Sequence, residues 1–349
     1  MSFLDFLSAA SSNPSFLFVS LLIFGVVFVN GWTDAPGAIT ASVSTGVLKM
    51  KNAAILAAIF NFLGALIMGA FNSSVMRSLG EITMLIGSGE GALAVLCASM
   101  LSIIIWATLA WAFGIPTSES HALISGVLGG ALAVGSEITP HSFNALKLAL
   151  IGLVFSLPIG FLTGIIYSKL LNLIFRNING QKRELFIKRG QITGAAFMAF
   201  MHGAQDSQKF AGVFVAAACM TSSASSDFGL SNAPMWITVL CSLIIALGTS
   251  VGGYRIIKKV GMETVTLTHK TGLASDMAGA TCMLLASLGG IPVSTTHTSS
   301  ASIIGAGMSE KNGTLKVSSL KDMLLAWLFT FPSCGLISFG LSRLIINLI

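Results

Sequence analysis

Residues 114–121 read GIPTSESH, and residues 290–297 read GIPVSTTH. A second pair of related motifs precedes them, with NGWTD at residues 30–34 and HGAQD at residues 202–206. The later pair is separated by 176 residues (from 114 to 290) and the earlier pair by 172 residues (from 30 to 202). Both motifs recur in the same order, and both are offset by nearly the same number of residues, about half the length of the chain. This pattern indicates gene duplication. The sequence therefore predicts two related structural halves.

The composition places these halves in a membrane. The chain has 349 residues, of which 54% are hydrophobic and only 9% are charged, and its mean hydropathy is +0.87. Soluble domains carry about 25% charged residues, and several apolar runs here exceed the ~20 residues that a spanning helix needs. We expect an all-α polytopic membrane protein whose surroundings are lipid. The net charge of +6 is typical of basic cytoplasmic loops, so we expect no nucleic-acid partner.

Each half contains one apolar region that Gly-Ile-Pro interrupts, at 91–136 and at 272–308. Such a break at membrane depth is tolerated only where it faces protein or a water-filled cavity. We interpret both regions as re-entrant helical hairpins with the motif at the tip, and a kinked continuous helix is the alternative. With each hairpin counted as two, the chain has about ten membrane segments. The expected spanning segments, three in each half, are 12–48, 52–71 and 143–172, then 190–220, 233–254 and 322–347.

Three crossings in each half make the halves inverted repeats, at 1–175 and 190–349, joined by a basic cytoplasmic linker at 176–189. If both termini are extracytoplasmic, 14 of the 19 Lys and Arg residues lie on the cytoplasmic side, whereas the Ser-rich outer loop 221–232 has none. This topology satisfies the positive-inside rule for a multi-pass protein of the cell membrane. The hairpins then enter from opposite faces, and their tips meet near the middle. The 14 basic residues are Lys49, Lys51, Arg176, Lys182, Arg183, Lys188, Arg189, Arg255, Lys258, Lys259, Lys270, Lys311, Lys316 and Lys321.

Two acidic residues, Asp34 and Asp206, occupy matching positions of the repeat inside apolar spans. An ionisable residue at membrane depth costs at least ~2.5–3.5 kcal/mol, which favours a functional role. Carboxylates surrounded by hydroxyl and carbonyl oxygens suit a hard cation such as Na⁺ and can equally carry a proton. We expect this pair to hold a coupling cation, and structural hydrogen bonding is the alternative.

Hydroxyl-rich clusters follow both prolines and precede apolar runs, so they are expected at helix N-termini. Free backbone N–H groups and the positive end of the helix dipole point there. Two such ends that face each other at the midplane form an anion site, as in other inverted-repeat transporters. Simple N-capping by Ser or Thr is the alternative. The candidate residues are Ser118, Glu119 and Ser120 in the first half, and Ser294, Thr295 and Thr296 in the second.

His202 and Lys209 lie in or just after the second acidic motif. His202 is a candidate contributor to the site. Lys209 is a candidate to neutralise Asp206 or to attract the anion, and snorkelling of its ammonium group to water is the competing explanation. Gly37, Gly64 and Gly69 are expected to allow close helix packing.

At this point the motifs resemble a known family, the inorganic phosphate transporter (PiT) family, and its bacterial branch most closely. The stretches that carry the resemblance are NGWTDAPGAITASVSTGVL at 30–48, KNAAILAAIFNFLGAL at 51–66, HGAQDSQKFAGV at 202–213 and the two hairpin motifs. The resemblance implies a phosphate symporter with inverted repeats, coupled to Na⁺ or H⁺. Its binding residues correspond to Asn30, Thr33, Asp34, Gln205, Asp206 and the hydroxyls at the hairpin tips.

The chain departs from the family pattern at four places. The family often has Asn directly before each acidic residue, where Thr33 and Gln205 stand here, and it commonly has Asn at the position of Gly37. Glu119 replaces a hydroxyl or small residue at the first tip. These changes bear on the coupling ion and on the anion, and some relatives move sulfate.

We therefore expect a secondary active transporter that imports inorganic phosphate by cation-coupled symport with alternating access. In this hypothesis Asp34 and Asp206 hold Na⁺ or a proton, and the hairpin tips hold phosphate. Because each charge stabilises the other at the midplane, their binding is coupled. The alternatives are a permease for sulfate or another tetrahedral oxyanion and, with less support, an anion channel. Since no HExxH motif is present, we expect no enzyme. We also expect no cofactor, and the oligomeric state stays open, a homodimer included.

Overall fold

The computed structural model describes residues 2–137, 139–221, 234–251, 253–310 and 313–348. Throughout these residues the regular structure is helical, apart from one isolated β-bridge between Val265 and Leu315. The predicted all-α class is confirmed. The greater part of the Ser-rich loop, residues 222–232, and Lys311 lie outside the described residues.

The first half begins with a short terminal helix, and its first spanning helix is broken at Asp34. Asn13 caps the start of α2, where Pro14 occupies the first helical position, a favourable combination because proline needs no N–H partner there. The elements are α1 (Phe3–Ser12), α2 (Pro14–Thr33), the 3₁₀ turn η1 (Ala35–Ile39), α3 (Thr40–Ser44), α4 (Met50–Phe71), α5 (Ser74–Thr83), the 3₁₀ turn η2 (Met84–Ile86), α6 (Glu90–Ala112), α7 (Glu119–Val134) and α8 (Pro140–Ile174).

The second half starts with the long helix α9, which already begins inside the predicted linker 176–189. Most of that linker is therefore helical. The elements are α9 (Gly180–Thr221), α10 (Met235–Val251), α11 (Tyr254–Ile257), the π-helical turn η3 (Lys258–Thr264), α12 (His269–Leu288), α13 (Thr295–Met308) and α14 (Val317–Ile346).

A multi-pass membrane architecture is evident from helix length and composition. Among the described residues, five helical stretches are long and apolar enough to cross a membrane, or six if α10 and the bent segment after it count as one. Helix α9 is not among these stretches, because polar residues of the site interrupt its apolar sequence. Conversely, α6 is among them although we expected it to be one arm of a hairpin. The five stretches are Pro14–Ser44, Met50–Phe71, Glu90–Ala112, Pro140–Ile174 and Val317–Ile346.

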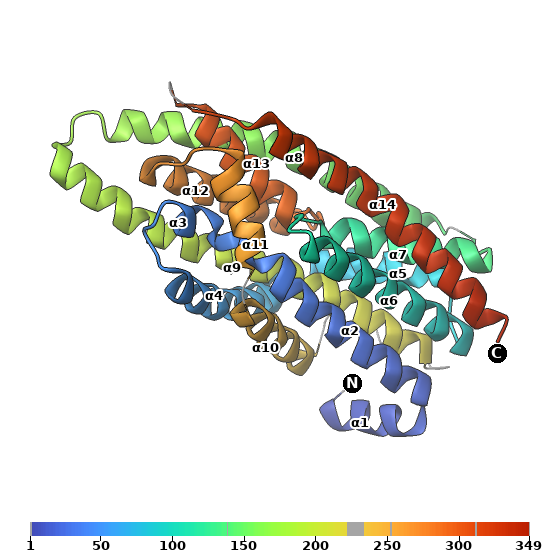
Figure 1. Cartoon of the computed structure of the whole chain (residues 1–349). Helices are drawn as coiled ribbons and strands as arrows, with labels where there is room; N and C mark the ends of the chain where they lie inside the picture. Colours follow the sequence, from blue (N-terminus) through green and yellow to red (C-terminus); the bar gives the residue numbers. More distant parts are fainter. Residues whose placement is uncertain (1, 138, 222–233, 252, 311–312, 349) are drawn as a thin grey trace.

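Both regions with a Gly-Ile-Pro break form helical hairpins, as predicted, and not kinked continuous helices. Helices α6 and α7 lie side by side, and so do α12 and α13. The chain reverses through Gly114 (φ +68°) and Gly290 (φ +66°), in the left-handed region that glycine adopts at little cost. The two hairpins enter from opposite ends of the bundle (Figure 1), and the two termini lie at the end opposite the α8–α9 connection.

Each hairpin is held by elements of the other half of the chain. Helix α7 packs against α14, and α13 packs against α8. The short helices α5 and α11, which we did not predict, hold the turns: the Ser78 hydroxyl donates to the Gly290 carbonyl (3.1 Å), and the Arg255 guanidinium donates to the Ala112 carbonyl (2.8 Å). The two halves are therefore interlocked.

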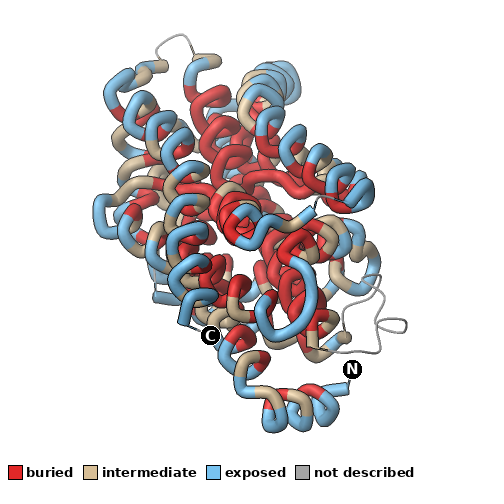
Figure 2. The backbone as a smooth tube through the Cα atoms, turned by 90° about the vertical axis from the view of Figure 1, so that its right-hand side faces the viewer, coloured by how far each residue is buried: buried red, intermediate tan, exposed pale blue. Residues whose placement is uncertain are grey.

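Helix α9 runs through the middle of the bundle, where the buried residues gather (Figure 2). Its crossing with α4 depends on small residues, because a Cβ at Gly64 would overlap the backbone of Phe200 and a Cβ at Gly203 would overlap that of Asn61. The predicted close packing at Gly64 is thus confirmed, and a Cβ at Gly69 would lie 2.9 Å from a methyl of Thr238. Such contacts are typical of helices that associate in lipid.

Candidate functional site

Asp34 lies at the break between α2 and η1, where it caps the end of α2 and its backbone N–H donates to the Asn30 carbonyl (2.9 Å). It is 3% exposed. The hydroxyls of Thr295 and Thr296, in the first turn of α13, donate to its two carboxylate oxygens at 2.7 and 2.5 Å. The second hairpin therefore reaches across to the acidic residue of the first half.

Asp206 lies in the middle of α9 and is 1% exposed. Its Oδ2 accepts a hydrogen bond from the amide of Asn30 (2.9 Å). Its Oδ1 accepts one from the ammonium of Lys209 (2.8 Å), and the Thr295 hydroxyl lies 3.4 Å away. As with Asp34, part of this environment comes from the other half of the chain.

His202 joins the two acidic residues. Its Nε2 lies 3.8 Å from an oxygen of Asp34 and 3.5 Å from an oxygen of Asp206. These three side chains each offer one ligand atom, and the three atoms lie within 4.8 Å of one another. With the adjacent threonine hydroxyls, the donors are mainly hard oxygens, which fit Na⁺ or a proton better than a transition metal. The predicted convergence of Asp34 and Asp206 is present.

The hairpin tips contact each other directly. The Ser120 hydroxyl donates to the Val293 carbonyl (3.1 Å), and the Thr296 hydroxyl lies 2.8 Å from the carbonyl oxygen of Thr117. The rings of His121 and His297 are 4.5 Å apart. The tips therefore form one continuous polar layer at the centre of the bundle.

The serines that begin α7 and α13 act as N-caps. Ser118 accepts a hydrogen bond from the backbone N–H of His121 (3.3 Å), and Ser294 accepts one from that of His297 (3.1 Å). For the hydroxyls of Ser118 and Ser294, N-capping, the alternative to anion binding, is therefore what the structure shows. The backbone N–H groups that precede those of His121 and His297, at residues 119–120 and 295–296, have no partner within their own helix. Both helix N-termini point their dipoles toward the contact between the tips.

Glu119 and Gln205 make contacts that sequence patterns did not indicate. One oxygen of Glu119 accepts a hydrogen bond from Thr33 (3.0 Å), and its other oxygen is buried without a hydrogen-bond partner among the described residues. The amide of Gln205 donates to the Ser287 hydroxyl (2.9 Å). Gln205 therefore anchors α9 to α12 and makes no hydrogen bond to the two acidic residues.

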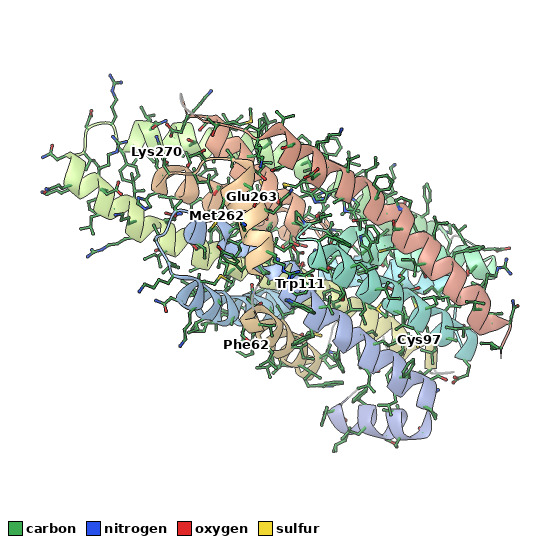
Figure 3. The ribbon with its side chains drawn as sticks, viewed as in Figure 1. Phe62, Cys97, Trp111, Met262, Glu263 and Lys270 are labelled. Atoms are coloured by element: carbon green, nitrogen blue, oxygen red, sulfur yellow. The ribbon has the colours of Figure 1, made fainter. Side chains whose placement is uncertain are left out.

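Sequence reasoning missed the residues that hold the first hairpin turn. The Trp327 indole donates to the Pro116 carbonyl (3.0 Å). The Arg255 guanidinium lies 4.8 Å from the centre of the Trp111 ring, which in turn lies 4.3 Å from that of Trp32. Trp111 lies where α2, α6 and α11 meet (Figure 3). The sequence offered one signal: in each half a short segment separates the second spanning helix from the hairpin. In the second half this segment is α11, which contains Arg255.

A family profile described as "Phosphate transporter family" matches residues 30–338, which contain all four motifs. The chain belongs to the phosphate transporter family. Its relatives include two proteins described as "Probable low-affinity inorganic phosphate transporter". The one from Bacillus subtilis (strain 168) is 33% identical over 92% of this chain and 94% of its own length. The one from Rhizobium meliloti (strain 1021) is 32% identical over 89% of this chain and 90% of its own length.

A solved structure of a sodium-dependent phosphate transporter has the same fold. The TM-score is 0.82, the two chains are 20% identical, and the match covers 97% of this chain and 100% of the other. The family profile and the curated relatives confirm the resemblance inferred from the motifs at the level of the family, which consists of transporters and not of enzymes.

Proposed function

We propose that this chain is a secondary active transporter that imports inorganic phosphate together with a coupling cation, Na⁺ or H⁺. The observation that carries the proposal is the meeting of two helix N-termini with two carboxylates in one buried layer. The relatives named for inorganic phosphate support phosphate as cargo. A sodium-dependent transporter of the same fold supports a coupling cation.

In this proposal phosphate lies between the first turns of α7 and α13. The backbone N–H groups of Glu119, Ser120, Thr295 and Thr296 are the donors, and the hydroxyls of the two threonines turn toward the anion. The cation binds beside Asp34, where two hydroxyl groups and a carboxylate are in reach. Because opposite charges stabilise each other in a medium of low dielectric constant, neither ion is stable there alone.

The burial of the site supports a carrier and not a channel. Asp34 and Asp206 are 3% and 1% exposed, so the two carboxylates are shielded from water in this conformation. Alternating access then requires the hairpins, or the helices that hold them, to move relative to the rest. The two inverted halves, 1–175 and 190–349, and the extracytoplasmic placement of both termini belong to this proposal. A permease for sulfate is the second candidate, because the same donors suit any tetrahedral oxyanion.

Uptake of radiolabelled phosphate into proteoliposomes tests the proposal, with a Na⁺ or a pH gradient imposed in turn and sulfate added as competitor. We expect saturable phosphate uptake that one gradient drives and that sulfate does not inhibit. The variant Asp34→Asn should lose gradient-driven uptake, because its amide carries no charge for the cation. Glu184→Gln is the control, since this exposed residue pairs with Lys188 and lies 22 residues before Asp206 on α9, about 33 Å along the helix. Transport of sulfate in place of phosphate would overturn the cargo, and flux that is linear in concentration would indicate a channel.

A further inference from the structure

The carboxylates of Asp34 and Asp206 differ in the groups that donate hydrogen bonds to them. The Asp206 side chain accepts from an ammonium group, that of Lys209, at 2.8 Å. The Asp34 side chain accepts from two neutral hydroxyls, those of Thr295 and Thr296. The repeat places the acidic residues at equivalent positions, so this difference in partners distinguishes their roles.

Lys209 is held in place by its own helix and by burial. It lies three residues after Asp206 on α9, a spacing that puts both side chains on one helix face. The residue is 2% exposed, so its ammonium group does not reach water, and snorkelling does not explain its position. A buried ammonium is stable only with a carboxylate partner, and the geometry supplies that partner directly.

The remaining oxygen of Asp206 is also used by the protein. Its Oδ2 accepts from the Asn30 amide, and amide N–H groups can only donate. Both oxygens of Asp206 are thus already engaged, so a cation that approached Asp206 would compete with Lys209 and Asn30. Hydroxyls, in contrast, can turn from donating to Asp34 to offering a lone pair to a cation beside it. Asp34 is therefore the carboxylate that can exchange its partner during a transport cycle.

We propose that Lys209 is a tethered cation: its ammonium permanently occupies the cation position at Asp206, so that only Asp34 takes an exchangeable cation. A lysine ammonium is a compact point charge, comparable in charge to a monovalent ion. Lys209 would thus set how many coupling cations accompany each anion. This inference rests on the proposed cation-coupled transport, and it assigns Lys209 a role in stoichiometry and not in direct contact with phosphate.

The test compares the wild type with Lys209→Met, Lys209→Arg and the double variant Asp206→Asn/Lys209→Met. Phosphate uptake is measured against Na⁺ concentration, with choline as replacement, and then against pH. We expect Lys209→Met to bind one more coupling cation per phosphate than the wild type. Its phosphate uptake should then depend more steeply on Na⁺ or H⁺ concentration, and one more charge should move per phosphate. Lys209→Arg and the double variant should keep the wild-type cation order, because the charge at this position is balanced in both.

Three outcomes would overturn the inference, two in the cation order and one in phosphate uptake itself. One is a Lys209→Met variant whose cation order equals that of the wild type. The other is a double variant whose cation order is one lower, since this would mean that Asp206 binds an exchangeable cation. Loss of phosphate uptake in both methionine variants but not in Lys209→Arg would assign the ammonium to the anion, which also contradicts the proposal.

A second measurement needs no transport. A ligand that binds only the folded protein raises its stability in proportion to the logarithm of ligand concentration, with a slope that counts the ions bound. The Tm of purified protein in detergent is therefore measured against Na⁺ concentration without phosphate. We expect a steeper slope for Lys209→Met and the wild-type slope for the double variant, and equal slopes for Lys209→Met and wild type would refute the idea. If the wild type does not transport phosphate, the proposed function fails, and this comparison still tests Lys209.

Discussion

The crossing of α9 and α4 provides a quantitative link between packing and transport. A Cβ added at Gly203 would lie 2.1 Å from the carbonyl oxygen of Asn61, whereas ordinary van der Waals contact begins at 3.4 Å. The two helices must therefore separate by about 1.3 Å at this contact in Gly203→Ala. Overpacking of this kind costs about 1–3 kcal/mol of stability.

The functional effect should be larger than the loss of stability indicates. Gly203 is flanked by His202 and lies three residues before Asp206, so a shift of α9 displaces both side chains from the site. In enzymes a misplacement of about 1 Å costs on the order of 100-fold in rate. We expect a reduction of similar size in gradient-driven phosphate uptake by Gly203→Ala, together with a lower Tm.

The assay is initial uptake into proteoliposomes, normalised to incorporated protein, with thermal unfolding followed by circular dichroism. Gly340→Ala is the matched control, because Gly340 lies in α14 and an added Cβ there has no heavy atom within 4 Å. The control should transport like the wild type and gain about 0.5–1 kcal/mol from the better helix propensity of alanine. Wild-type uptake by Gly203→Ala at equal incorporation would refute the argument that close α4–α9 packing positions the site.

Three further substitutions test single contacts. Trp327→Phe removes the indole N–H that donates to the buried Pro116 carbonyl. We expect a loss of about 1–3 kcal/mol of stability, measured as a lower midpoint in thermal unfolding, and an unchanged midpoint would contradict this role. Thr296→Val keeps the side-chain shape but removes the hydroxyl that donates to Asp34. Half-maximal phosphate uptake should then need a higher cation concentration, whereas an unaltered cation dependence would place the cation elsewhere. Arg255→Met removes the donor that holds the end of α6; uptake should fall while phosphate affinity is retained, and a selective loss of affinity would speak against a purely positioning role.

Much of the architecture could be predicted because its signals are local or repeat in the chain. Low charge and long apolar runs identify a membrane protein, since lipid excludes unpaired polar groups. The two Gly-Ile-Pro breaks predicted the hairpins, and Gly114 and Gly290 adopt the backbone conformation that such turns require. The family resemblance followed from four short motifs, and it is confirmed by a profile that matches residues 30–338.

Other features had no local signal. The short helices α5 and α11 hold the hairpin turns through contacts between residues far apart in the sequence, such as Ser78 with Gly290. The start of α9 inside the expected linker was hidden by the basic residues there, because a charged exposed helix and a charged loop have similar compositions. Gln205 was placed with the acidic residues by its position in the motif, yet its side chain points to Ser287 on α12.

The sequence by itself determined the membrane class, the hairpins and the residue types available at the centre. Only the tertiary structure decided which donor meets which carboxylate. Lys209 pairs with Asp206, while Thr295 and Thr296 of the opposite hairpin pair with Asp34. The physical reason is that periodicity and composition specify which face of a helix is buried, whereas a hydrogen bond depends on a few tenths of an ångström between groups that only the packed fold brings together.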